Sequence, residues 1–369
     1  MSDSRPTFEL ATSNQGSPLP SQGRGRGLGA PAESIETLVE LMYEAGWTDG
    51  LPVVPPLRSL VDRFVESSGR AANDVVAVLP PLGGTATVER VAANAVMAGC
   101  RPEYMPAVIA SLEAMLDDRF NLRGMQCSTH LSTPLLIFNG PIRRELDINC
   151  GANVFGQGWR ANATIGRAVK LALVNIGGAV PGDADKSTFG HPGKYTYCIG
   201  ENEEESPWEP LHVERGLAAD ASAVTVYGAE APHNVNNQTA DSPYDLLRTI
   251  SSMMANLGSN HPYLMSESMV VLSPEHARVC ADAGWRKADV RQFLFETARV
   301  RHGDLKGGGI YGGNTAKNPW PRWVDRSSDD TLVPIARRAV DIVVIVAGGP
   351  GRHSLYIPGW GTRSNTRSV

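Results

Sequence analysis

The sequence is poor in cysteine, lacks any long apolar run and carries no excess of basic residues. Its five cysteines are scattered and form no CxxC pair: Cys100, Cys127, Cys150, Cys198 and Cys280. This pattern argues against a disulfide framework and favours a reducing cytoplasm. No stretch approaches about 18 consecutive apolar residues, so we expect no membrane span. The formal net charge of −5 offers no broad basic surface for nucleic acid.

What the sequence does contain is typical of a globular protein with a sizeable core. Of its 369 residues, 42% are hydrophobic and 20% are charged, and 38 glycines with 26 prolines indicate many ordered loops. Residues 1–33 are rich in Ser, Gly, Pro and Gln and lack the apolar run of a secretory signal, so we predict a disordered tail. Residues 34–369 then form one large catalytic-type domain, or two closely packed lobes that divide near residue 185.

Hydrophobic periodicity and turn residues place strands and helices in alternation along this body. Short apolar runs predict strands at 75–79, 135–138, 223–227, 269–272 and 341–347. Helical spacing predicts helices at 35–46, 85–98, 102–116, 161–175, 243–257, 274–283 and 286–300. The alternation predicts an α/β (or α+β) fold, with a mixed, largely buried sheet, helices packed on it and ordered loops rich in glycine and proline.

The segment 187–216 combines histidine, lysine, glutamate and proline in a mixture that indicates an active site. His191 precedes a rigid Pro-Gly turn, and Lys194 follows that turn. His212 and Glu214 alternate with two apolar residues, so on an extended strand both would project from one face. Such a pair binds a metal ion, or works as a histidine oriented by a carboxylate. The alternative for residues 203–205 is an exposed acidic turn.

A second candidate is Cys127-Ser-Thr-His130, which precedes the predicted strand at 135–138. Cys127 would form a thiolate–imidazolium pair with His130 if the loop curls. The alternative is that His130 only satisfies buried carbonyl groups.

Two further candidates follow predicted strands, where α/β proteins commonly place polar site residues. Glu230, His233 and Asn234 lie just beyond the strand at 223–227 and would bind a polar substrate or complete a metal shell. Alternatively, they only turn the chain. Near the end of the sequence, the turn at 348–351 has amides suited to an anion, with Arg352 and Ser354 beside it, or is a plain tight turn. No Rossmann, P-loop or other nucleotide-cofactor motif is present.

Six phrases together resemble a known bacterial family: WTDGLPVVPP (47–56), NAVMAGCRPEYMP (94–106), NGPIRREL (139–146), NATIGRA (162–168), GHPGKYTYC (190–198) and ENEEESPWEPLHVERG (201–216). The family is associated with UGSC proteins, whose small partner or fused domain carries a Cys- or selenocysteine-Gly-Ser-Cys motif. The resemblance covers most of 34–369. It implies a bacterial, cytoplasmic protein that is one subunit of a thiol-dependent enzyme. This chain itself contains no Cys-Gly-Ser-Cys.

These features lead to the hypothesis of an enzyme, or its large subunit, that acts on a small polar or anionic metabolite as a metal- or thiol-assisted reductase or lyase. The predicted catalytic residues are Cys127, His130, His212 and Glu214. The predicted ligands of a divalent metal (Zn, Fe or Mn) are His191, His212, Glu214 and His233. The predicted substrate-binding residues are Lys194, Asn234, Arg352 and Ser354.

Two other classes remain open from the sequence. The chain is alternatively a non-catalytic scaffold or activator of a thiol- or selenol-bearing partner, which it would contact through Trp47, Trp208 and the tryptophans within 320–323. A metal-free hydrolase is the third possibility, with no nucleophile motif to support it. In each case we expect an oligomer.

Overall fold

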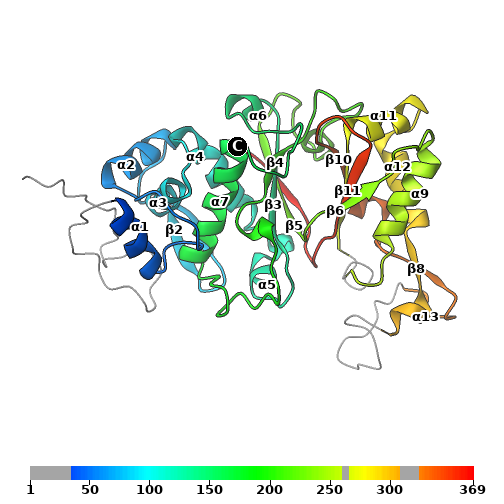
Figure 1. Ribbon diagram of the computed structural model, residues 1–369, viewed down its shortest axis with the longest axis horizontal. Coiled ribbons are helices and arrows are strands. Elements are labelled where there is room, and N and C mark those ends of the chain that lie inside the picture. Colours follow the sequence, from blue (N-terminus) through cyan, green and yellow to red (C-terminus); the bar gives the residue numbers. More distant parts are fainter. Residues whose placement is uncertain (1–34, 260–265, 308–323) are drawn as a thin grey trace, which may run out of the picture.

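The computed structural model describes residues 35–259, 266–307 and 324–369 (Figure 1). The tail predicted at 1–33 lies outside these ranges, as do the tryptophans within 320–323. Two four-stranded sheets and the helices around them make up most of the described chain.

The first sheet combines strands that are distant in sequence. It consists of β3 (Thr133–Asn139), β4 (Cys198–Gly200), β5 (Ala223–Ala229) and β12 (Asn365–Ser368), in the order β12-β5-β3-β4. β3 and β4 are parallel, whereas β5 is antiparallel to both β3 and β12. The starts of β3 and β4 therefore lie at the same edge of the sheet as the end of β5.

The second sheet has the order β10-β7-β11-β6. Its strands are β6 (His233–Asn236), β7 (Ser268–Leu272), β10 (Ile342–Val346) and β11 (His353–Ile357). β7 and β10 are parallel, and β11 is antiparallel to both β7 and β6. β6 thus forms one edge of the sheet.

The two sheets pack face to face between two helical layers (Figure 1). Leu135 and Ile137 of β3 face the second sheet and share an apolar cluster with Val271 of β7. The alternate residues Leu136 and Phe138 join the cluster formed by α3 (Val88–Ala98), α4 (Met105–Ala114) and α7 (Arg160–Asn175). The far face of the second sheet is covered by α9 (Pro243–Met254), α11 (Pro274–Asp282) and α12 (Lys287–Thr297). Strands covered on both faces read as continuous apolar runs.

Shorter elements complete the described chain. The remaining α-helices are α1 (Ile35–Glu44), α2 (Arg58–Ser67), α5 (Leu122–Gln126), α6 (Ile142–Glu145), α8 (Leu211–Glu214) and α13 (His302–Leu305). The 3₁₀ turns are η1 (Pro102–Tyr104), η2 (Asp118–Phe120), η3 (Pro192–Lys194) and η4 (Ala339–Asp341). Two hairpin-like pairs join β1 (Val75–Leu79) to β2 (Gly84–Thr87) and β8 (Arg299–Arg301) to β9 (Leu332–Pro334).

The structure confirms the predicted α/β or α+β class with mixed sheets and helices packed on them. All five predicted strands are present, within two residues of their expected bounds. The helix expected at 85–98 begins only at Val88, because β2 pairs with β1 and Thr87 then caps the helix by accepting a hydrogen bond from the Arg90 amide.

The strand expected around His212 and Glu214 is wrong. Residues Leu211–Glu214 form the short helix α8, which starts after Pro210. Pro210 is extended and lacks an amide hydrogen, a suitable residue at the boundary of a helix. The two polar side chains therefore do not line one face of a strand.

The chain does not divide simply between the two sheets. β4, β5 and β12 all follow residue 185, yet they share a sheet with β3, which precedes it. A division near residue 185 would therefore cut the first sheet, and the number of domains stays a prediction. No helix within the described ranges is both long and apolar enough to cross a bilayer. All five cysteines are free thiols.

Candidate functional site

Three of the segments singled out in the sequence meet at one edge of the first sheet. His130 precedes β3, His191 precedes β4, and Glu230 follows β5. Because β3 and β4 are parallel and Thr133 pairs with Ala229, these three positions share an edge. The strand order alone brings together residues that are up to 100 positions apart.

His130 is held between a carboxylate and an aromatic ring. Its Nε2 lies 3.0 Å from Oε1 of Glu230, and both side chains are largely buried, with exposed fractions of 14% and 11%. The indole of Trp360 stacks on the imidazole, with centroids 6.3 Å apart and an interplanar angle of 17°. Trp360 is placed there because Gly359 bridges to Ala229, the last residue of β5. A carboxylate that orients a histidine is a common arrangement for proton transfer.

The loop from Asp185 to Lys194 is tied to the His130 loop by hydrogen bonds. Lys194 Nζ lies 2.6 Å from Oδ2 of Asp185 and donates to Ser187 Oγ at 2.5 Å. Ser187 Oγ in turn donates to the backbone oxygen of His130 at 2.7 Å. The ammonium of Lys194 is therefore fixed in place and paired.

His191 lies beside these groups as a neutral imidazole. Its Nδ1 accepts a hydrogen bond from the Gly193 amide at 3.2 Å, which leaves the ring proton on Nε2. Burial lowers the pKa of His191 to about 4, and the positive charges of Lys194 and Lys170 act in the same direction. The ring packs edge-on against Tyr197, with centroids 5.6 Å apart.

Lys170, on α7, is the residue at this edge that sequence reasoning missed. Gly166 precedes it by one helical turn on the same face, and a Cβ at Gly166 would lie 2.8 Å from the backbone nitrogen of Tyr197. This glycine lets α7 approach the segment that carries His191 and Lys194. The only signal in the sequence is a single charge within the apolar run AVKLAL.

The Lys170 ammonium is half-buried and makes no hydrogen bond or ion pair with any residue that the structure describes. Burial and, to a smaller extent, the charge of Lys194 together lower its pKa to about 8, against a smaller opposing effect of Asp185. Roughly one Lys170 side chain in ten is therefore a neutral amine at pH 7. We call the following side chains the basic cluster: His130, Lys170, Asp185, His191, Lys194 and Glu230.

Cys127 lies near this edge, but no contact between its thiol and the ring of His130 is among the interactions described. The thiol is exposed at the end of α5, and the ring of His130 packs against Glu230 and Trp360. A thiolate–imidazolium pair between Cys127 and His130 therefore stays a prediction.

His212 and Glu214 lie at the opposite edge of the sheet, beyond the end of β4. Glu201, fully buried after that strand, accepts a hydrogen bond from the Leu211 amide at 2.8 Å. The seven residues of β3 separate the two edges by about 20 Å. His212 is fully buried there. The predicted catalytic set is therefore wrong as a single site, because His212 and Glu214 lie far from Cys127 and His130.

Glu214 serves as a counter-charge in the packing of α8 against α12. It accepts hydrogen bonds from Lys287 at 3.1 Å and from Arg291 at 2.7 Å. Lys287 and Glu214 are only 5% and 12% exposed, so each neutralises a charge that burial would otherwise make costly.

The four predicted metal ligands occupy three separate places. His191 is in the basic cluster, His212 and Glu214 are near α8, and His233 is exposed on β6 of the second sheet. They do not form one coordination shell. In the described ranges, no group of three or more His, Cys, Asp or Glu side chains is arranged to hold a metal ion. The binding of a divalent metal stays a prediction.

The predicted anion-binding turn already holds a carboxylate of the chain. The Gly351 amide donates to Oε1 of Glu275 at 2.9 Å, and Arg352 lies within ion-pair distance of Glu275 and Asp241. Ser354 is buried, and its Oγ lies 2.7 Å from Nδ1 of the equally buried His276. Arg352 and Ser354 thus have partners within the chain, and their role in substrate binding stays a prediction.

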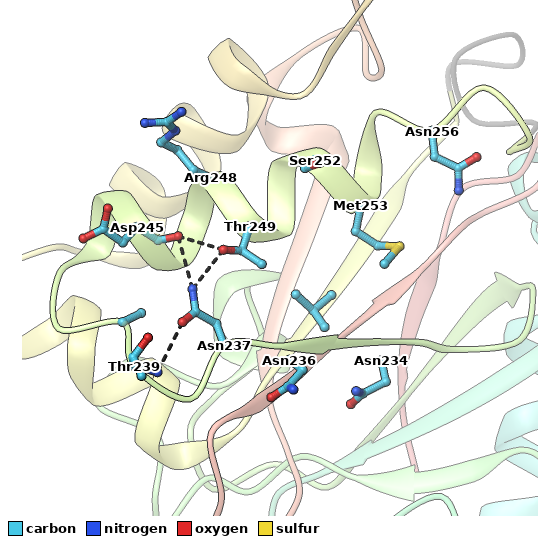
Figure 2. A pocket seen from close by; sticks show the side chains of 12 residues that line it. Asn234, Asn236, Asn237, Thr239, Asp245, Arg248, Thr249, Ser252, Met253 and Asn256 are labelled. Carbon is cyan, nitrogen blue, oxygen red and sulfur yellow. Dashed lines mark hydrogen bonds between the residues drawn. The ribbon is translucent and has the colours of Figure 1, made fainter.

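A cavity of about 780 Å³ forms a groove between β6 and α9 (Figure 2). Asn234 lines it and lies with Asn236 on one side of β6, while Asn237 donates to Oγ1 of Thr249 at 2.9 Å. No histidine, cysteine or lysine is among its described lining residues. The charged side chains among its described lining residues are Asp245 and Arg248.

No model of a known protein family matches the sequence, and no curated protein is significantly similar to it. The fold and the site define the chain as a four-layer protein, helices on sheet on sheet on helices, with the basic cluster at one sheet edge. The resemblance to the UGSC-associated family stays a prediction.

The ion network of Glu214 gives a first prediction. Glu214→Gln should lower the free energy of unfolding by about 3 kcal/mol, because it removes the carboxylate that Arg291 pairs with and leaves Lys287 only the more distant Glu201, at 4.0 Å. Urea denaturation measures this. Glu205→Gln is the matched control, since Glu205 forms only a half-exposed pair with Arg278 and should change stability by less than about 1 kcal/mol. Equal stability of Glu214→Gln and wild type would contradict the structural role.

The two lysines of the cluster should respond in opposite ways to neutralisation. Lys194→Met strands the Asp185 carboxylate and should lower the free energy of unfolding by about 2 kcal/mol at pH 7. Lys170→Met removes a charge that burial disfavours and should raise the free energy of unfolding by about 1 kcal/mol.

The pKa of Lys170 also determines how the stability of the wild type and of Lys170→Met should change with pH. Because the pKa of Lys170 falls from 10.5 to about 8 on folding, wild-type stability rises as pH increases from 8 to 10.5. The advantage of Lys170→Met is therefore largest at and below pH 8 and disappears above pH 10.5. Thermal denaturation of both proteins across this pH range measures the difference in stability. A lower stability of Lys170→Met at pH 7 would contradict the view that the charge of Lys170 destabilises the fold.

Proposed function

We propose that the protein is an enzyme, or the larger subunit of one, that acts on a small anionic metabolite at the basic cluster. The observation that carries this proposal is Lys170, a half-buried amine with no partner in the described chain, beside a second lysine that is firmly paired. Groups of interacting side chains with perturbed pKa values are concentrated at functional sites.

The charges of the cluster favour an anionic ligand. Lys194 is balanced by Asp185, and a protonated His130 is balanced by Glu230. Lys170 is the one lysine of the cluster that makes no ion pair with a residue in the described chain. A carboxylate or phosphate group supplies that counter-charge, and burial of the site strengthens the attraction.

The same groups suit a lyase. Such a reaction removes a proton from carbon next to a carbonyl or carboxylate and protonates a leaving group. Lys170, with a pKa of about 8, is a base near neutral pH, and His130 held by Glu230 is a proton donor or acceptor in fixed orientation. A thiol-assisted reductase is the second candidate, because Cys127 is exposed three residues before His130 and accessible to a thiol-bearing partner.

Of the four tryptophans predicted for the scaffold interface, the two in the described part of the chain are buried or partly buried. Trp47 is 3% exposed within the apolar core, and Trp208 donates to the backbone oxygen of Trp285 at 3.0 Å while it packs on α12. Phe189 is the strongly exposed aromatic near the basic cluster, at 91%. If a partner docks, we propose that it does so over Phe189. An oligomer also remains a proposal.

A ligand screen tests the proposal. We expect at least one small carboxylate or phosphate to raise the melting temperature of wild type by a few degrees, since ligand at 100 times Kd adds about 2.7 kcal/mol. Lys170→Met should lose this shift. Lys186→Met should keep it, because Lys186 is exposed and donates only to the Gly182 carbonyl. Equal shifts in wild type and Lys170→Met would refute the assignment of the site.

Turnover of a substrate found in this way should depend on pH. If neutral Lys170 is the base, kcat/KM should rise about tenfold per pH unit below pH 8 and level off above it. A steady-state pH profile measures this limb. A profile that is flat between pH 6 and 9 would assign the base elsewhere.

A further inference from the structure

We infer that the groove between β6 and α9 binds an extended, uncharged segment of another polypeptide, which pairs with β6 as a fifth strand of the second sheet. No member of the basic cluster is among the described residues that line the groove. The inference therefore stands independently of the proposed function.

The direction of the main-chain groups of β6 follows from the register of the second sheet. β6 lies at the edge of this sheet and pairs with β11. The carbonyl oxygen of His353 accepts a hydrogen bond at 3.4 Å from the residue that follows β7, so the main-chain groups of His353 point toward β7. Those of Ser354 therefore point toward β6, where they meet Val235. The main-chain groups of Asn234 and Asn236 then point away from β11, toward the open edge.

These outward main-chain groups have no partner in the described chain. Neither the amide nor the carbonyl oxygen of Asn234 or Asn236 makes a hydrogen bond with a residue that the structure describes, and both residues are exposed. The edge thus offers a donor and an acceptor on each of two residues that lie about 7 Å apart. The main chain of an extended peptide carries donors and acceptors at the same repeat, so it is the ligand that matches this edge.

The groove runs along this open edge (Figure 2). Each of the four residues 234–237 lines it, and no described residue of β11 does. Because successive side chains of a strand point to opposite faces, a groove that touches all of these residues follows the edge where their main chain lies. The opposite wall is α9, with Ser252 and Met253. A chain segment in the groove therefore lies beside the outward groups of Asn234 and Asn236.

The lining of the groove favours an uncharged segment. Asp245 and Arg248 have opposite charges and lie toward one end of the groove (Figure 2). The other polar lining residues carry neutral amides and hydroxyl groups, and Met253 adds apolar surface. A charged side chain in the middle of the segment would find no counter-charge there, so polar uncharged or small apolar side chains fit best.

Comparison with the other sheet edges supports an open site at β6. The outer edge of β10 is covered, because Asn202 donates from its amide to the Val346 oxygen at 2.7 Å. The outer edge of β4 is covered by Asn162, which donates to the Cys198 oxygen at 3.1 Å. β12 carries the charged Arg367. Proteins protect edges by cover, charge or proline, whereas β6 has no Lys, Arg, Asp, Glu or Pro and no covering segment in the described chain.

A narrow segment fits this site better than a second folded copy of the chain. The four residues of β6 span about 13 Å. A stable dimer buries about 800 Å² on each partner, far more than pairing along so short an edge provides. The groove is also concave, so a single extended chain enters it, whereas the surface of a folded copy would leave it unfilled.

Peptide selection tests the inference. A displayed library of random short peptides is selected on the immobilised full-length protein, and enriched sequences are synthesised with capped ends. Fluorescence anisotropy then measures their Kd. Asn236→Pro removes one outward amide hydrogen but no bond to β11, and should weaken binding about tenfold, because one main-chain hydrogen bond is lost. Asn236→Ala keeps the amide hydrogen and should bind as wild type does.

Two further variants locate the peptide. Ser252→Trp fills the groove from α9 and should also prevent binding, without a change in β6. Phe189→Ala is the matched control, since Phe189 lies in the loop before β4 of the first sheet, and it should bind the peptides as wild type does. Melting temperatures measured alongside show that each variant is folded.

Methylated peptides test the same hydrogen bonds in wild-type protein. Methylation of one alternating set of peptide amides should abolish binding, because that set faces β6, and methylation of the other set should not. Equal effects of the two sets would refute strand pairing, as would equal losses in Asn236→Ala and Asn236→Pro.

The remaining outcomes identify other occupants. If no peptide is enriched, or if the enriched peptides lose affinity for Phe189→Ala and not for Ser252→Trp, the groove does not bind a polypeptide segment. If wild type is a dimer in sedimentation experiments and Asn236→Pro is a monomer, the occupant is a second copy, which also refutes the inference.

Discussion

The register between β3 and β5 is the constraint on which the candidate site depends. Seven residue pairs, from Thr133 with Ala229 to Asn139 with Ala223, fix this register. A shift by one residue would turn Leu135 and Ile137 away from the second sheet and expose the wrong face of β3 to it. The face-to-face packing of the sheets therefore also determines that the loops carrying His130 and Glu230 begin side by side.

Charged side chains are paired differently at the two ends of the strands of the first sheet. At the end of β4, buried cations and carboxylates neutralise one another, as Lys287, Arg291 and Glu214 do. Near the start of β3, Lys194 pairs with Asp185, whereas Lys170 makes no ion pair with a described residue. Natural proteins retain such locally unfavourable groups mainly where function requires them. The contrast within one sheet is a stronger argument for a site than either edge alone.

Much of the fold could be predicted from the sequence, because strands buried on both faces show apolar runs and helices show their period. The convergence of His130, His191 and Glu230 could not, since it follows from strand order and from a parallel pairing between β3 and β4. α8 was mistaken for a strand because four residues are too few to show a helical period. Lys170 was overlooked because the partners of a lysine, or their absence, are visible only in three dimensions.

The position of β12 has a consequence for how the protein folds. This strand, residues 365–368, closes the edge of the first sheet by pairing with β5, about 140 residues earlier in the chain. β3, in turn, pairs with strands that follow it by 60 to 90 residues. Contacts of such long range slow folding, because loop closure must precede the energetic gain. During synthesis, the β5 side of the first sheet therefore remains unpaired until nearly all of the described chain has been made.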